Sequence, residues 1–329
     1  MVPMIGVGLW LLAGAAMGRA VRGTARACGA GRSALAVWFL LAAFAIVLLF
    51  RPHEDIFGGQ DPGAYLNAAC SFARHKTLFH TDPLLAQVNE RLRAEFFYGH
   101  SGFGLTKDAC LWVSDLKTAR IGPWFLPAYA VMMSAVAWLV APAAVLYVAP
   151  LLGLLTAATL AMLAARLIRR PWAGAAAFLL YVLNPVVIWN ARAPRAEMGA
   201  GFFLMIGWVL IFDAWDRARR RGGLDLTLGA ICLGVAPFFH ATAWHPVLAS
   251  FAVLCWIAVA GRLDFLPVVP VAVLTVAGFI AQTRFVTDCY AIWRFAEPLL
   301  RHPAAIGAAG CLGAAILAQE LVMSTSGGG

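Results

Sequence analysis

The polar segment at residues 53–65 holds the first candidates for chemistry and follows directly on an apolar run that ends at residue 50. Asp61 precedes Pro62, a pair typical of a helix N-cap followed by proline at the first helical position, and it predicts a surface helix that continues to about Lys76. The same carboxylate, held at a helix start just above a bilayer, is also placed to act on a lipid-linked substrate. The sequence leaves both interpretations of Asp61 open.

Two arginines and an acid form a second candidate site in a short polar stretch between two apolar runs: Arg192, Arg195 and Glu197. One interpretation is a hairpin turn whose arginines extend to the membrane interface. The other is a phosphate site, because the planar guanidinium fork can bind two phosphate oxygens at once. In the second case Glu197 would orient an arginine.

His240 and His245 form a third candidate, near the end of an apolar run. Residues five apart do not share a helix face well, so the two are not typical of a metal pair. A single histidine near a helix end is usually a neutral, hydrogen-bonded structural group, and the neighbouring Trp244 is first interpreted as an interface anchor. His240 is kept as a candidate for substrate binding.

Other catalytic motifs are absent from the sequence. The seven cysteines lack the spacing of a zinc site, and only Cys70 and Cys110 could pair if their loop faces an oxidising compartment. The sequence contains no HExxH, Walker A, GxSxG or GxGxxG motif. Metalloprotease, NTPase, α/β-hydrolase and dinucleotide-enzyme functions therefore have no support, and no metal site is predicted.

These candidates belong to a chain of 329 residues that is 62% hydrophobic and 12% charged, whereas soluble domains are about 45–50% apolar and 25% charged. The composition, a mean hydropathy of +0.80 and the length of the apolar runs predict an all-α polytopic membrane protein with eight to ten membrane segments. The net charge of +9 comes from arginine clusters between these runs, so we expect no nucleic-acid partner. The runs lie at residues 2–18, 34–50, 123–140, 143–165, 172–190, 198–212, 226–243, 246–260, 265–283 and 303–319.

Residues 51–122 form the one long water-compatible segment between the runs, with eight basic and eight acidic residues, and their aromatic content predicts a folded outer loop. If 123–140 lies in the interface or re-enters the membrane without crossing it, the other loops up to residue 262 place twelve arginines inside and only Arg192 and Arg195 outside. If 123–140 crosses, the count becomes six inside and eight outside. The positive-inside rule favours the first topology, whose twelve inside arginines are Arg19, Arg22, Arg26, Arg32, Arg166, Arg169, Arg170, Arg217, Arg219, Arg220, Arg221 and Arg262.

Four segments, in this order and spacing, resemble the N-terminal half of the GT-C glycosyltransferases, membrane enzymes that transfer sugars from polyprenyl-phosphate donors. The resemblance covers roughly residues 40–245, and the segments read GGQDPGAYLNAA, GPWFLP, YVAPLLGLLTAATLAMLAARLIRR and LNPVVIWNARAPRAEMGAGFF. It implies a GT-C-like helical bundle with a long first outer loop.

The resemblance implies that Asp61 is the catalytic base, and it places an Arg-to-acid motif at residues 192–197, where Arg192 or Arg195 would bind the donor phosphate and Glu197 would orient it. Tyr65 and His240 are further candidates for substrate binding. Many family members follow the base with a second acid, and here Pro62 stands in its place. Glu54 and Asp55 could supply a second carboxylate only if the glycine turn that separates them from Asp61 folds back. No cofactor is therefore certain, and a divalent cation stays possible.

The implied reaction is sugar transfer from a polyprenyl phosphate to an acceptor lipid, glycan or protein at the outer face of a membrane, as expected for the bacterial inner (plasma) membrane. The alternative is a transporter or lipid flippase with loop 51–122 as a lid. Spans without acidic or basic residues count against transport. The expected organisation is an N-terminal signal-anchor helix with an Arg-rich loop at 1–33, a GT-C-like module at 34–283, and an outer segment, last apolar helix and flexible tail at 284–329.

Overall fold

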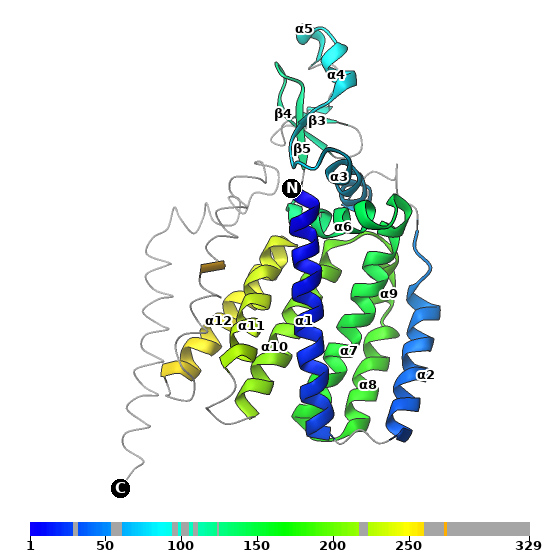
Figure 1. Ribbon diagram of the computed structural model, residues 1–329, viewed down its shortest axis with the longest axis vertical. Coiled ribbons are helices and arrows are strands. Elements are labelled where there is room, and N and C mark those ends of the chain that lie inside the picture. The colour runs from blue at the N-terminus through cyan, green and yellow to red at the C-terminus, as the bar shows by residue number, and fades with distance from the viewer. Residues whose placement is uncertain are drawn as a thin grey trace.

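The computed structural model describes a helical bundle with a small mixed unit at one end (Figure 1). The described residues are 1–28, 32–53, 61–93, 98–99, 105–107, 111–123, 125–216, 223–259 and 273–274. The helices are α1 (Val2–Cys28), α2 (Arg32–Leu49), α3 (Asp61–His75), α4 (Pro83–Gln87), α5 (Glu90–Arg93), α6 (Pro127–Leu139), η2 (Pro142–Tyr147), α7 (Val148–Ile168), α8 (Pro171–Val182), α9 (Pro185–Arg192), α10 (Ala196–Asp216), α11 (Gly223–Val235), η3 (Ala236–Phe238), η4 (Ala241–Ala243) and α12 (Trp244–Val259).

Three helical segments in the described part of the chain are long and apolar enough to cross a membrane: Val2–Thr24, Pro142–Ile168 and Ala196–Ala214. A fourth is counted if α8 and α9, bent by 65° at their junction, form one broken span. The sequence predicted eight to ten segments, and the difference has two causes. Several apolar runs form helices of only 10–17 residues, and nearly all of the chain from residue 260 on lies outside the described residues.

The bundle carries large apolar side chains on its outside as well as in its core. Phe39, Trp172 and Leu180 are 74%, 66% and 76% exposed, although apolar patches on soluble monomers are small. Inside, small residues let helices approach closely: a Cβ on Gly229 of α11 would lie 2.8 Å from the carbonyl oxygen of Gly207 on α10. Close packing through small residues is common between helices in membranes.

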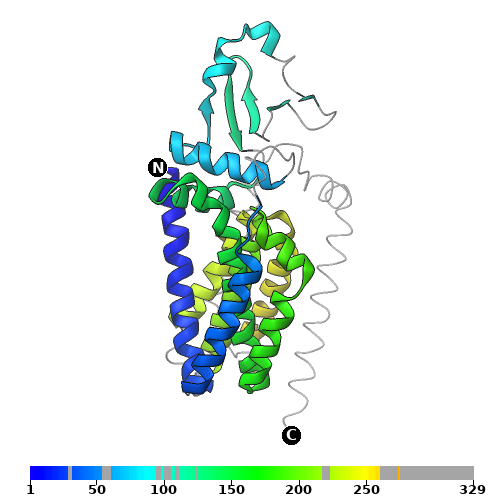
Figure 2. The same ribbon diagram turned by 90° about the vertical axis from the view of Figure 1, so that its right-hand side faces the viewer.

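Helix α6 lies across the end of the bundle that carries the mixed unit, as both views show (Figures 1 and 2). It has 13 residues and starts at Pro127, which fits the first helical turn because proline has no N–H to leave unpaired. The indole Nε1 of Trp10 donates to the carbonyl oxygen of Met132 at 3.1 Å and ties α1 to α6. This arrangement agrees with the prediction that 123–140 does not cross the membrane.

The outer loop contains a β-sheet, so the expectation of an all-α chain was wrong for this segment. Five short strands pair antiparallel in the order β1-β5-β4-β3-β2, and β4 and β5 place Val113 opposite Ile121. Both residues are buried with Leu85 and Ala119 in a separate small core. The strands are β1 (His80–Thr81), β2 (Tyr98–Gly99), β3 (Leu105–Lys107), β4 (Leu111–Asp115) and β5 (Arg120–Pro123). Strands this short give little periodic signal, because their register is set by cross-strand partners.

One buried arginine fixes the outer loop to its sheet. Arg93 is 9% exposed, and its guanidinium donates to the carbonyl oxygens of Val88 at 2.9 Å, Leu116 at 2.7 Å and Ala86 at 3.1 Å, and to that of Lys117. The part of the loop that the structure describes is therefore folded, as the aromatic content of the loop predicted.

The opposite end of the bundle is held by ion pairs. Arg166 of α7 lies 2.9 Å from Asp213 of α10, and Arg19 of α1 pairs with Asp225 of α11. The apolar run 198–212 contains no charged residue, as predicted, but the helical segment Ala196–Ala214 extends beyond it at both ends and so includes Glu197 and Asp213. The N-terminal amine, by contrast, donates to the carbonyl oxygen of Lys76 at the end of α3, so the chain starts on the same side as the outer loop.

Candidate functional site

Helix α3 lies over α6 and presents Asp61 and Tyr65, one turn apart and so on the same helix face (Figure 2). The helix ends at His75, close to the predicted end, but it begins at Asp61 itself, so Asp61 is a residue of the first turn. A second Asp-Pro pair shows the geometry that was expected of Asp61. Asp82 precedes Pro83 at the start of α4, and its carboxylate accepts hydrogen bonds from the backbone N–H groups of Leu84 and Leu85, both at 2.9 Å.

Four predicted site residues from three distant parts of the sequence influence one another electrostatically. Burial raises the pKa of the Asp61 carboxyl above its ordinary value, and the Glu197 carboxylate raises it further. Arg195 and His240 act in the opposite direction and lower it. The fold therefore brings Arg195, Glu197 and His240 within electrostatic range of Asp61, and the net effect raises the Asp61 pKa, the direction that suits a general base.

Glu197 and His240 face each other at one side of this site. Glu197 lies in the first turn of α10, where the positive end of the helix dipole stabilises a carboxylate. Nε2 of His240 lies 3.8 Å from Oε1 of Glu197. Nδ1 of His240 accepts the backbone N–H of Thr242 at 3.3 Å and lies 2.7 Å from its hydroxyl oxygen. A neutral His240 ring therefore carries its proton on Nε2, on the side of Glu197.

The two arginines of the predicted phosphate site have different surroundings. Arg192 ends α9, and its Nε and Nη2 donate to the carbonyl oxygen of Leu48 at 2.9 and 2.6 Å, which fixes the end of α2. The Nε of Arg195 is buried and has no hydrogen-bond partner in the described structure, and its guanidinium carbon lies 5.9 Å from the ring centroid of Trp189. Arg195 thus has a buried donor to offer a ligand, whereas Arg192 binds the protein's own backbone.

Tyr65 leads to a residue that the sequence analysis missed. Its ring is 4% exposed and packs against the rings of Phe125 at 5.1 Å and Tyr129 at 5.3 Å. Tyr129, on α6, is fully buried, and its hydroxyl has no hydrogen-bond partner in the described structure. The signal in the sequence was weak: one tyrosine in the apolar run 123–140, which was interpreted only as a membrane or interface helix.

A divalent cation is not supported by the residues that the structure describes. Among them, no group of three or more His, Cys, Asp or Glu side chains could hold a metal ion. Glu54 and Asp55, the predicted sources of a second carboxylate, lie outside the described residues, as does Cys110.

The arrangement provides a half-buried carboxylate that can accept a proton, an arginine donor for an anion, and a carboxylate beside a histidine. All of it lies where the apolar bundle meets the outer loop. Comparison of the chain with protein-family models, curated proteins and solved structures found no match.

Proposed function

We propose that the protein is a polytopic membrane glycosyltransferase of the GT-C type that moves a sugar from a polyprenyl phosphate to an acceptor at the outer face of the membrane. The observation that carries the proposal is the convergence of Asp61, Arg195, Glu197 and His240 at the end of an apolar bundle. The resemblance noted in the sequence assigns a base and a phosphate-binding arginine to the same positions. Three or four helices long enough to span a membrane agree with a lipid-linked substrate.

In the proposed reaction an acceptor hydroxyl or amine attacks the anomeric carbon of the sugar. Asp61 takes the acceptor's proton as the new bond forms, and the bond from the anomeric carbon to the phosphate oxygen breaks. The polyprenyl phosphate leaves with the electron pair of that bond. Because negative charge grows on the phosphate as the bond breaks, Arg195 stabilises the transition state more than the bound donor.

The depth of the site fits a donor of this kind. A polyprenyl chain stays in the hydrocarbon region while its phosphate and sugar lie at the interface, which is the level where α3 and α6 cover the bundle (Figure 1). Trp189, beside Arg195, is 61% exposed on the outside of the bundle, as expected of an aromatic side chain at a membrane interface. The proposed localisation is the bacterial inner (plasma) membrane, with the site on its outer face.

The experiment is sugar transfer by the purified protein in lipid nanodiscs, with a panel of radiolabelled polyprenyl-phosphate hexoses and pentoses and a membrane extract as the source of acceptors. Arg195→Ala should lower kcat by about 10²–10³-fold, the loss typical of one donor to a developing anion. Arg195→Lys should lower kcat by a smaller factor, because lysine keeps the positive charge although it loses the planar fork of the guanidinium.

Arg192 supplies the matched control, since it is an arginine three residues away whose donors bind Leu48. Arg192→Ala should lower the free energy of unfolding by about 2 kcal/mol, because it removes charged hydrogen bonds to a carbonyl, and should affect kcat less than Arg195→Ala does. If the protein transfers sugar from none of these donors, the proposed function is overturned. Wild-type kinetics in Arg195→Ala removes that residue from the site.

A further inference from the structure

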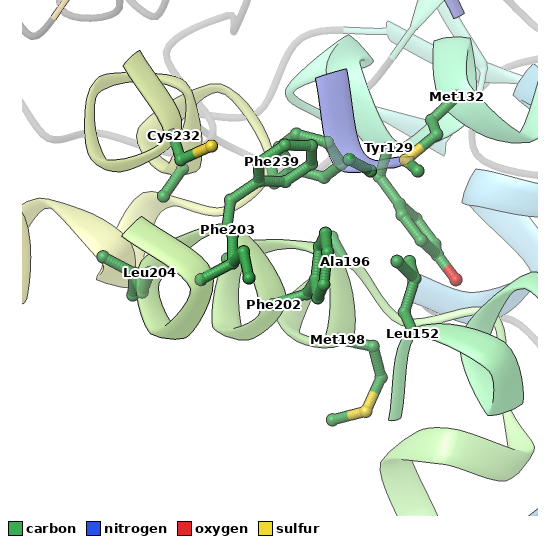
Figure 3. Close-up of a cluster of buried hydrophobic side chains, with 14 of the residues drawn as sticks. Tyr129, Met132, Leu152, Ala196, Met198, Phe202, Phe203, Leu204, Cys232 and Phe239 are labelled. Carbon is green, nitrogen blue, oxygen red and sulfur yellow. The ribbon is translucent and has the colours of Figure 1, made fainter. Parts of the chain in front are cut away.

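The hydroxyl of Tyr129 is a buried polar group without a hydrogen-bond partner in the described structure, although its ring is fully packed. Leaving a buried hydroxyl unpaired costs about 1–3 kcal/mol, so such groups are rare in folded proteins and call for an explanation. In Figure 3 the ring of Tyr129 lies at one edge of the buried cluster, and its oxygen is at the end of the side chain that points away from Phe239.

Tyr129 packs against the segment that carries His240. Its ring centroid lies 6.5 Å from that of Phe239, the residue before His240, and Nε2 of His240 lies 3.8 Å from Oε1 of Glu197. Burial raises the pKa of the Tyr129 hydroxyl far above its ordinary value, and the Glu197 carboxylate raises it further. The phenol therefore keeps its proton at neutral pH. It can donate a hydrogen bond to a ligand, but it cannot serve as the base.

Tyr129 and Glu197 together favour a neutral ligand group over an anion. A hydroxyl can accept the proton of the Tyr129 phenol and donate its own proton to the Glu197 carboxylate, so both protein groups are satisfied at once. A phosphate oxygen at the same place would be repelled by Glu197. The buried Nε of Arg195 is the donor that suits the phosphate.

We propose that Tyr129, together with Glu197, binds one hydroxyl group of the transferred sugar and so determines which sugar is accepted. The inference rests on the proposed function and assigns a specificity-determining role to a residue on α6. Tyr65 holds the ring of Tyr129 edge-on at 5.3 Å, and Phe239 packs on it at 6.5 Å. These contacts involve the ring alone, so Tyr129→Phe removes the oxygen and keeps the packing.

The test compares wild type, Tyr129→Phe and the control Tyr147→Phe, which removes a hydroxyl from a half-exposed tyrosine that stacks on Phe50. The substrates are the polyprenyl-phosphate sugar that wild type transfers best and its monodeoxy analogues. For the parent donor, Tyr129→Phe should lose about tenfold in kcat/KM, the value of one hydrogen bond. The kcat/KM of wild type should be about tenfold lower with one particular analogue than with the parent donor. The kcat/KM of Tyr129→Phe should be the same with that analogue as with the parent donor.

A measurement without any donor accompanies the kinetics. The unfolding midpoint of Tyr129→Phe should equal or exceed that of wild type, because the variant removes an unpaired buried hydroxyl. A lower midpoint would show that the hydroxyl has a structural partner and would overturn the inference. Wild-type kinetics, or an equal loss with the parent and with every analogue, would also overturn it. If wild type transfers no sugar, the proposed function fails and the inference fails with it.

Discussion

Replacing Asp61 by asparagine separates catalysis from helix capping, because Asp82 provides the same Asp-Pro pair in a capping role. Asp61→Asn keeps the size of the side chain and much of its capping ability but removes the base. Loss of a general base lowers the rate by about 10²–10⁴-fold. Asp82→Asn, with its cap largely preserved, should leave the rate unchanged.

The two positions should also differ in stability. The carboxylate of Asp82 accepts two backbone N–H groups at 2.9 Å, so Asp82→Ala should cost about 1 kcal/mol, within a range of 0.5–2. The folded-state pKa of Asp61 is raised by burial. Its ionised form therefore destabilises the fold, and this loss of stability grows as the pH rises from the unfolded-state pKa to the folded-state pKa. At neutral pH, Asp61→Asn should unfold at the same temperature as wild type or at a higher one.

The assay is transfer of radiolabelled sugar in nanodiscs, combined with thermal unfolding of each variant at neutral pH. Activity and stability should change independently: Asp61→Asn should lose transfer and stay folded, and Asp82→Ala should lose stability and keep transfer. Wild-type turnover by Asp61→Asn would refute the role of Asp61 as base. A joint loss of folded protein and activity in Asp61→Asn would show that the residue caps α3.

Two further predictions follow from the pKa of Asp61 and from the direction of α1. Because Asp61 must be ionised to act as the base and its pKa is raised, kcat/KM should fall as the pH drops through that pKa. Glu197→Gln should move this acid limb to lower pH and Arg195→Gln to higher pH. Shifts of both variants in the same direction would contradict the site. On intact cells after mild reduction, a membrane-impermeant thiol reagent should label Cys70 on α3 and spare Cys28 at the far end of α1, whereas labelling of Cys28 alone would reverse the proposed orientation.

Features with a local cause were predictable from the sequence. Apolar runs predicted most of the bundle helices, since a helix satisfies its own backbone hydrogen bonds in an apolar surrounding. The Asp61-Pro62 pair predicted the start of α3 to within one residue. That 123–140 does not cross the membrane stays a prediction from the arginine distribution, and the 13-residue helix α6 fits it. Asp61, Arg195, Glu197 and His240 were also chosen from their residue types and their places between the apolar runs.

Other features depend on contacts between distant residues, and only the tertiary structure decided them. Arg192 and Arg195 are equivalent in the sequence, but the carbonyl oxygen of Leu48 binds Arg192 and leaves the Nε of Arg195 without a partner in the described structure. Tyr129 owes its position to ring contacts with Tyr65 on α3 and with Phe239 after η3, both far away in the chain. A residue's type sets which chemistry it can perform, whereas burial and long-range partners determine whether its donors and acceptors remain available to a ligand.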